Sequence, residues 1–237
     1  MPLPSDDGST AQQLFLQAQA AWSARVTPPF ELFVLPCAAT FLESRCPPGA
    51  DVEFIVRHSD GRTYAQTVAT AGTTPVTLVR GGYITGPDGA PLGFYRRLPG
   101  SVTPQIGPPP DLADDPLRTI ATVTAIDVAY RIRLAGDEKI EGVDSAHLVL
   151  EPVRDPAAYP LRDLWVARKG YEVMRLTYAL PFKRSTALVT YDFAPVGTPP
   201  QWSIVRIAAV SGGEAISEDL REISFPPHEP QSYFAPP

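Results

Sequence analysis

Proline is the feature of this sequence that most restricts what the chain can fold into. The chain contains 28 prolines among its 237 residues, about 12% where about 5% is usual. Because proline has no backbone N–H and breaks helix interiors, this content excludes an all-helical bundle and predicts many turns and strand edges. Apolar residues make up 44% of the chain, which is enough for a sizeable core and excludes a disordered chain. We therefore expect a β-rich, frequently interrupted fold.

The charge pattern argues against two classes of partner. The net charge is -6, and the chain has no run of Lys or Arg that could grip nucleic acid or an anionic membrane surface. No apolar run reaches the roughly 18 residues of a membrane span, and residues 1–6 lack the basic start and apolar core of a signal peptide. We expect a soluble monomer without a nucleic-acid partner, corresponding to the mature form of an exported protein.

The two cysteines, Cys37 and Cys46, lie close together in the sequence. No histidine is near them and their spacing differs from C-x-x-C, which argues against a metal site and against redox chemistry. A local disulfide is the simplest use and would stabilise the fold by roughly 2.5 kcal/mol in the chain-entropy model. It would persist only in an oxidising compartment, which favours export. The alternative is two unrelated buried thiols.

Residues 9–25 carry the one clear helical pattern. The apolar side chains recur at three- and four-residue steps and form one stripe, composed of Ala11, Leu14, Phe15, Ala18, Ala21 and Trp22. The pair Pro28 and Pro29 ends the helix. The stripe must pack against an apolar surface, and we expect residues 1–8, which precede the helix, to be disordered.

The first half of the chain after this helix reads as strands followed by a long irregular stretch. Predicted strands cover residues 30–35, 52–57, 63–70 and 76–85, and Asp60-Gly61 is a hairpin turn signal. Residues 81–117 contain eight prolines and seven glycines, which disfavours regular ladder pairing for most of that stretch. We expect a flap over 81–117, parts of which dock on the body through aromatic side chains.

The second half predicts an antiparallel meander. Strand patterns cover residues 118–134, 143–153, 161–168, 171–180, 185–194 and 202–211, and the connections between the later ones are short. Short loops force antiparallel neighbours, because parallel pairing needs a crossover of a dozen residues. Alternation places Met174, Leu176, Tyr178, Val189, Tyr191 and Phe193 on one apolar face. We expect a curved sheet wrapped around the N-terminal helix, with a β-sandwich as the alternative.

Catalytic and metal-binding signals are weak. The three histidines, His58, His147 and His228, lie far apart, each without a recognisable set of metal ligands. The chain has no Gly-x-Ser-x-Gly, no phosphate-binding loop and no Gly-x-Gly-x-x-Gly. We expect a protein that is not an enzyme and uses no metal and no cofactor.

Three stretches, 147–153, 161–167 and 171–178, together resemble the LolA/LolB-like superfamily of periplasmic lipoprotein localisation and outer-membrane lipoprotein-sorting proteins. Leu-Glu-Pro at 150–152 and Leu-Arg-Asp-Leu-Trp-Val at 161–166 are similar to the family's strand ending in Leu-x-Pro and its strand of the type Leu-x-Leu-Trp-Val, and an apolar strand follows. The aromatic strand 188–193 and the closing Ile-Ser-Phe-Pro at 223–226 are also similar. The resemblance implies an incomplete antiparallel barrel around helices, with a hydrophobic cavity that shields acyl chains in the periplasm.

The resulting hypothesis is a periplasmic carrier for a lipid or lipidated protein, served by a membrane-bound donor or acceptor protein. It predicts one domain over residues 9–228 and a C-terminal tail over 229–237. The predicted cavity lining is Phe15, Trp22, Met174, Leu176, Tyr178, Val189, Tyr191 and Phe193. An acyl chain gains about 0.8 kcal/mol per buried CH₂, so such a site needs little directional chemistry. The alternatives are an ordinary packed core at these positions, and a sensor module that binds a protein partner through the flap.

Overall fold

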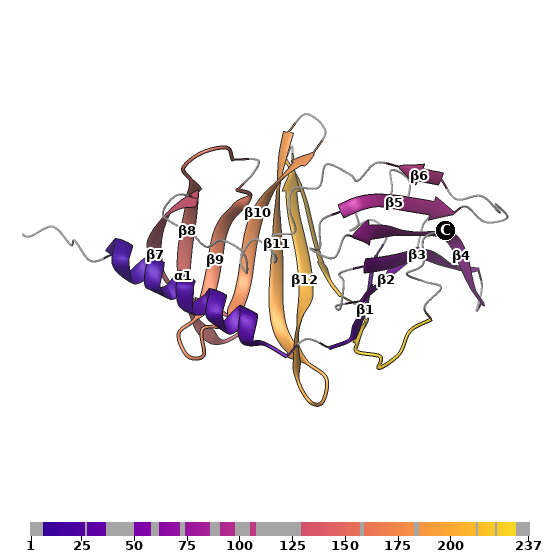
Figure 1. Cartoon of the computed structure of the whole chain (residues 1–237), viewed down its shortest axis with the longest axis horizontal. Helices are drawn as coiled ribbons and strands as arrows, with labels where there is room; N and C mark the ends of the chain where they lie inside the picture. Colours follow the sequence, from indigo (N-terminus) through magenta and orange to yellow (C-terminus); the bar gives the residue numbers. More distant parts are fainter. Residues whose placement is uncertain are drawn as a thin grey trace, which may run out of the picture. The chain divides into compact units, whose positions relative to one another are not determined.

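In the part of the chain that the structure describes, one helix and two seven-stranded sheets are present (Figure 1). The computed structural model describes residues 7–26, 28–36, 50–57, 62–71, 74–85, 91–97, 105–107, 129–156, 159–182, 185–211, 213–220 and 222–230. By proximity, these residues form two compact units. One unit comprises the described residues within 1–25, 112–194 and 206–216, and the other comprises those within 26–111, 195–205 and 217–237. The single domain expected over 9–228 stays a prediction.

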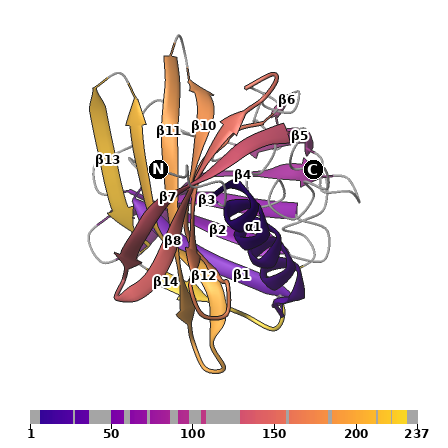
Figure 2. The same cartoon turned by 90° about the vertical axis from the view of Figure 1, so that its left-hand side faces the viewer.

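The helix α1 (Asp7–Ala24) follows the predicted stripe. Ala11, Leu14, Phe15 and Ala18 are buried on its inner side, as expected for an amphipathic helix. The helix packs against the strands β7 (Tyr130–Ile140) and β9 (Leu161–Ala167) (Figures 1 and 2). Within the part of the chain that the structure describes, no helix is both long and apolar enough to cross a membrane.

The second sheet contains the predicted meander. Its strands lie side by side in sequence order: β7 (Tyr130–Ile140), β8 (Val143–Pro152), β9 (Leu161–Ala167), β10 (Val173–Phe182), β11 (Ser185–Val196), β12 (Gln201–Ser211) and β13 (Glu214–Asp219). The pairs from β7 to β11 are antiparallel, because connections of a few residues allow no other arrangement. Of the predicted strand 118–134, the described part enters β7 at Tyr130.

The first sheet contains the early strands and the last strand of the chain. Its order is β14 (Glu222–Ser224), β1 (Phe30–Pro36), β2 (Asp51–Arg57), β3 (Arg62–Ala71), β4 (Thr74–Thr85), β5 (Pro91–Arg97) and β6 (Gln105–Gly107). Phe33 and Phe54 are register partners on β1 and β2, and their rings stack with centroids 5.1 Å apart. The predicted hairpin is present, since Arg57 pairs with Arg62.

The expectation of an irregular flap differs from the structure over the described residues of 81–117. Here the end of β4, together with β5 and β6, forms an antiparallel ladder with one register shift, between Ile84 and Thr85. The prolines do not prevent this pairing, because Pro91 is the first residue of β5, a position that tolerates proline. The remaining prolines of 81–117 lie outside the described residues, as do Cys37 and Cys46, so their disulfide stays a prediction.

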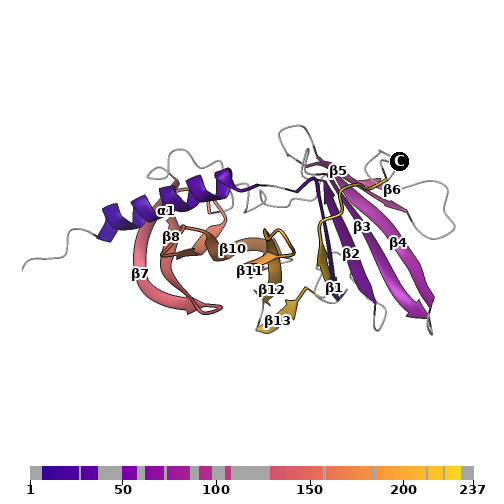
Figure 3. The same ribbon diagram turned by 90° about the horizontal axis from the view of Figure 1, so that it is seen from below.

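Two irregularities shape the second sheet. The register of β7 against β8 shifts between Leu134 and Gly136, and Gly136 has a φ of +149° that favours glycine. Two further shifts occur in the pairing of β10 with β9. Such irregularities bend a strand and increase its twist, and β7 is visibly bent (Figure 3).

Candidate functional site

The helix-side face of the second sheet is apolar. Leu164, Leu176 and Tyr191 are register partners across β9, β10 and β11, so their side chains leave the sheet on the same side. On β11, Phe193 shares this side and meets Trp22 of α1 edge to face, with ring centroids 5.4 Å apart. The helix therefore covers the face that alternation predicted to be apolar.

The structure gathers most of the predicted lining residues on this surface. Phe15, Met174, Leu176, Tyr178, Val189 and Phe193 are buried, whereas Trp22 and Tyr191 are half-buried. Val189 is the register partner of Tyr178, so it belongs to the same face. Burial alone is equally compatible with a cavity lining and with an ordinary core, so their role as a lining stays a proposal.

Two tyrosines on neighbouring strands of this face are joined by a hydrogen bond. The hydroxyl oxygens of Tyr178 and Tyr191 lie 2.9 Å apart, and the two rings have centroids 5.4 Å apart. Tyr191 also contacts Phe193 edge to face at 6.5 Å. Trp22, Phe193, Tyr191 and Tyr178 therefore form one aromatic cluster, which runs from the end of α1 across β11 to β10.

The strict alternation predicted for β10 is wrong at its start. Strict alternation from Met174 and Leu176 places Val173 on the opposite face, together with Arg175. In the structure Val173 is instead the register partner of the fully buried Val166. The register shift between Val173 and Arg175 causes the difference, because an extra residue in one strand changes which side chains share a face. Val173 therefore joins the apolar face, and Met174 is the additional residue of the bulge.

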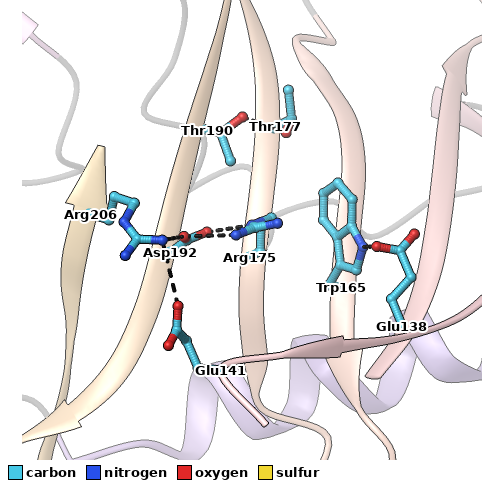
Figure 4. Close-up of polar contacts among 8 residues, drawn as sticks. All are labelled: Glu138, Glu141, Trp165, Arg175, Thr177, Thr190, Asp192 and Arg206. Atoms are coloured by element: carbon cyan, nitrogen blue, oxygen red, sulfur yellow. Dashed lines mark hydrogen bonds and ion pairs between the residues drawn. The ribbon is translucent and has the colours of Figure 1, made fainter. Parts of the chain in front are cut away.

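The opposite face carries a row of polar and aromatic side chains that sequence reasoning did not assemble. His147 on β8 pairs with Trp165 on β9, Trp165 with Arg175 on β10, and Arg175 with Asp192 on β11. Arg206 on β12 extends the row (Figure 4). We call these five residues the polar row. Only the strand register could have found it, since the five positions are scattered over sixty residues of sequence.

Asp192 lies at the charged end of the polar row. Its side chain is only 4% exposed. The carboxylate accepts hydrogen bonds from Nε and Nη2 of Arg175, the second at 2.9 Å. Arg206 Nη1 lies 3.5 Å from Oδ2 of the same carboxylate. The hydrogen bonds to Asp192 raise the pKa of Arg175. A buried carboxylate needs such partners, because the loss of water is otherwise uncompensated.

The aromatic end of the polar row is a stacked pair held by carboxylates. The rings of His147 and Trp165 are nearly parallel, with centroids 4.2 Å apart. Trp165 Nε1 donates to Oε2 of Glu138 at 3.1 Å, while Oε1 of Glu138 lies 3.0 Å from His147 Nδ1. His147 Nε2 lies 2.8 Å from Oδ1 of Asp163. Because each ring nitrogen faces a carboxylate, His147 is not the isolated residue that the sequence indicated.

The side chains of the polar row and their carboxylate partners form a hydrogen-bonded network. The two carboxylates at His147 face different ring nitrogens, and no three His, Cys, Asp or Glu side chains among the described residues are grouped to hold a metal ion. Beside the row, Thr177 and Thr190 share a hydrogen bond of 2.8 Å (Figure 4). The arrangement can hold neighbouring strands together and can fix what packs over them.

The comparison with solved structures concerns the whole fold. The crystal structure of a DUF1329 family protein from Desulfovibrio piger superposes with a TM-score of 0.51 and 13% identity, covering 98% of each chain. In the described residues, a helix packs on a sheet that has β7 and β13 as its edge strands. The resemblance to the LolA/LolB-like superfamily implied this architecture. The chain shares its fold with this DUF1329 family protein. At 13% identity the likeness extends to the fold alone.

Two further structures of the LolA-like kind are similar to this chain. One is a LolA superfamily protein from Nitrosomonas europaea, with a TM-score of 0.45, 13% identity and coverage of 95% of this chain and 97% of the other. The other is a domain described as an outer membrane lipoprotein-sorting protein from Vibrio parahaemolyticus, with a TM-score of 0.49, 14% identity and coverage of 94% and 97%. Both TM-scores lie below 0.5. No family model and no curated protein matches the sequence.

Proposed function

We propose that this protein is a carrier that acts by binding a lipid or a lipidated protein, and that it works in the periplasm. The acyl chain lies on the helix-side face of β9, β10 and β11, beneath α1. A membrane-bound protein delivers or accepts the cargo. The protein performs no catalysis on it, because binding of an acyl chain requires only an apolar surface that excludes water.

The observation that carries the proposal is the aromatic cluster under the helix. Phe193 and Tyr178 are buried, but Trp22 and Tyr191 beside them are half-buried. Trp22 lies in the last turns of α1 and contacts Phe193 at 5.4 Å. The cluster thus connects the buried apolar face with solvent at one end of the helix, where an acyl chain could enter without unfolding the sheet.

The energetics fit a carrier. Each CH₂ removed from water contributes about 0.8 kcal/mol, so ten buried carbons supply about 8 kcal/mol before the cost of ordering the chain. A helix that covers a sheet face through small residues such as Ala11 and Ala18 can shift without breaking strand pairing. The apolar contacts are non-directional, so chains of different lengths are accommodated.

A brominated fatty acid tests the proposal, because bromine quenches an indole only at close range. The variant W165F/W202F keeps Trp22 as the single tryptophan, and the matched control W22F/W202F keeps Trp165. Trp165 is on the opposite face of the same sheet, where it contacts Glu138 and His147. We expect saturable quenching of Trp22 by the brominated acid, and little quenching of Trp165.

Absence of quenching in both variants, with a bare polypeptide mass under native conditions, would contradict the carrier function and leave the aromatic cluster as an ordinary core. Equal quenching in both variants would contradict the helix-side location. A protein that remains bare but retains a partner protein in native mass spectrometry would favour the sensor module instead.

A further inference from the structure

The end of the β7–β8 hairpin makes a contact that a flat sheet would not allow. Glu141 lies in the turn between β7 and β8, and its Oε1 is 3.5 Å from Nη1 of Arg206 on β12. Strands β9, β10 and β11 separate β8 from β12, a distance of about 19 Å across a flat sheet. The two residues meet because the hairpin bends across the polar row (Figure 4).

The bend originates near Gly136 on β7, where the last part of the β7–β8 hairpin begins. The register shift between Leu134 and Gly136 interrupts the β7–β8 ladder, and Gly136 adopts a positive φ. Among the described residues, no atom lies within 4 Å of the place that a Cβ would take at Gly136. A backbone with this freedom and an interrupted ladder is suited to be a pivot.

Beyond this pivot, two carboxylates attach the hairpin end to the polar row. Glu138 accepts a hydrogen bond from Trp165 and lies beside His147, while Glu141 reaches Arg206. Arg206 also contacts Asp192, which binds Arg175. The contacts therefore form a circuit that leaves the hairpin at Glu141, crosses the sheet and returns at Glu138.

The backbone conformation of Glu141 is unfavourable for a glutamate, which indicates a role for its carboxylate. Glu141 and Gly142 have φ values of +48° and +81°, as in a two-residue hairpin turn in which Asn or Gly is preferred at both positions. A glutamate is unfavourable there, because a β-carbon is crowded at positive φ. The unfavourable backbone is consistent with a side chain retained for its contact with Arg206.

We propose that residues 137–143 are a strap that closes over the polar row, pivots at Gly136 and is held shut by Glu141 on Arg206. Glu141 and Arg206 have side chains 53% and 38% exposed, and exposed pairs of this kind are weak and sensitive to salt. Opening of the strap also breaks the ion pair of Asp137 with Arg168 and the end of the β7–β8 ladder, in which residues 137–140 pair with residues 143–146. It uncovers the stacked His147 and Trp165. This inference does not depend on the cargo proposed above.

Distance measurement between spin labels at V143C and V210C tests the strap. Val143 begins β8 within the strap, Val210 lies on β12, and both side chains are exposed. The labels are placed in a background in which Cys37 and Cys46 are replaced by serine. We expect one dominant short distance with the native strap, and a closed-to-open ratio about two- to five-fold lower in E141Q. Salt at 1 M should lower the ratio in the native strap but have little further effect in E141Q.

Two further variants distinguish a strap that Glu141 holds shut from a hairpin turn whose role is only structural. D144N removes a carboxylate of the same hairpin that pairs with Lys139 at 3.4 Å, and it should leave the distance distribution unchanged. E141N suits the turn backbone better, so it should open the strap as E141Q does without lowering the melting temperature. Identical distributions in the native strap, E141Q and E141N would overturn the proposal, as would an equal shift in D144N.

Discussion

Asp192 on β11 and Arg175 on β10 form a two-pronged ion pair on the face of the sheet that points away from α1. Both carboxylate oxygens bind the guanidinium, and Asp192 is 3% exposed. The two residues are also register partners, so the pair is set by the strand alignment itself. The pair joins the two central strands of the sheet on one face, while Leu176 and Tyr191 join them on the other.

Removal of one partner of this pair should destabilise the protein strongly. D192N leaves the guanidinium of Arg175 partly buried without its counter-charge, and we expect the free energy of unfolding to fall by about 3 kcal/mol. Urea unfolding measures this loss. The control is E151Q, which removes a carboxylate lying 3.8 Å from Arg133 with both side chains 60% exposed, and it should cost under about 0.5 kcal/mol. Equal losses would contradict the special position of Asp192.

Two leucines on neighbouring strands should differ sharply on truncation. Leu176 is fully buried under the helix, whereas Leu188 is 44% exposed. L176A leaves a cavity and should lower the free energy of unfolding by about 2–5 kcal/mol, while L188A should change it by about 0.5 kcal/mol or less. Chemical denaturation of the two variants compares them directly. A large effect of L188A would indicate that the outer surface of β11 is covered in solution.

Tyr130 gives the protein a specific dependence on alkaline pH. Burial raises the pKa of this phenol to about 12 from 10, so the folded state binds its proton more tightly than the unfolded state. The resulting stability is fully present below pH 10 and is lost as the pH rises towards 12, by on the order of 2 kcal/mol. Tyr130 Oη accepts a hydrogen bond from Leu161 N at 3.3 Å, which Y130F also removes.

Comparison of the wild type with Y130F isolates this effect from other groups that titrate above pH 10. The variant should be less stable by about 1 kcal/mol near neutral pH, and the difference should shrink or change sign between pH 10 and 12. Thermal unfolding across that range measures both quantities. A constant difference would show that Tyr130 ionises equally in both states.

Cys37 and Cys46 should form a disulfide in protein produced in an oxidising compartment. Thiol titration of the denatured protein should then find no free thiol, and the intact mass should rise by about 2 Da on reduction. The double variant C37S/C46S should lose roughly 2.5 kcal/mol of stability, because the closed loop is short. Two titratable thiols in freshly purified protein would support the alternative of independent cysteines.

The local patterns of the sequence account for the elements that the structure contains. The spacing of Leu14 and Phe15 predicts the buried side of α1, and both residues are buried. Short connections predict the antiparallel order from β8 to β11. Alternation predicts the shared face of Leu176 and Tyr191, which are register partners. These features depend on the geometry of a few consecutive residues, so they are readable without coordinates.

Register shifts and long-range curvature were decided only by the tertiary structure. A single extra residue in β10 moves Val173 to the apolar face, and no local signal marks it. Likewise, β5 and β6 pair despite the prolines around them, because a strand needs suitable residues only where its hydrogen bonds form. His147 gains its carboxylates from β7 and β9, strands that alternation alone does not align.

By itself the sequence determined a helix, a meander of strands and one apolar face, because these follow from periods of 3.6 and 2 residues. The tertiary structure alone decided that His147, Trp165, Arg175, Asp192 and Arg206 form a row, and that Glu141 crosses the sheet to reach it. The physical reason is that bulges and bending set which distant residues meet, and their effect accumulates over many strands.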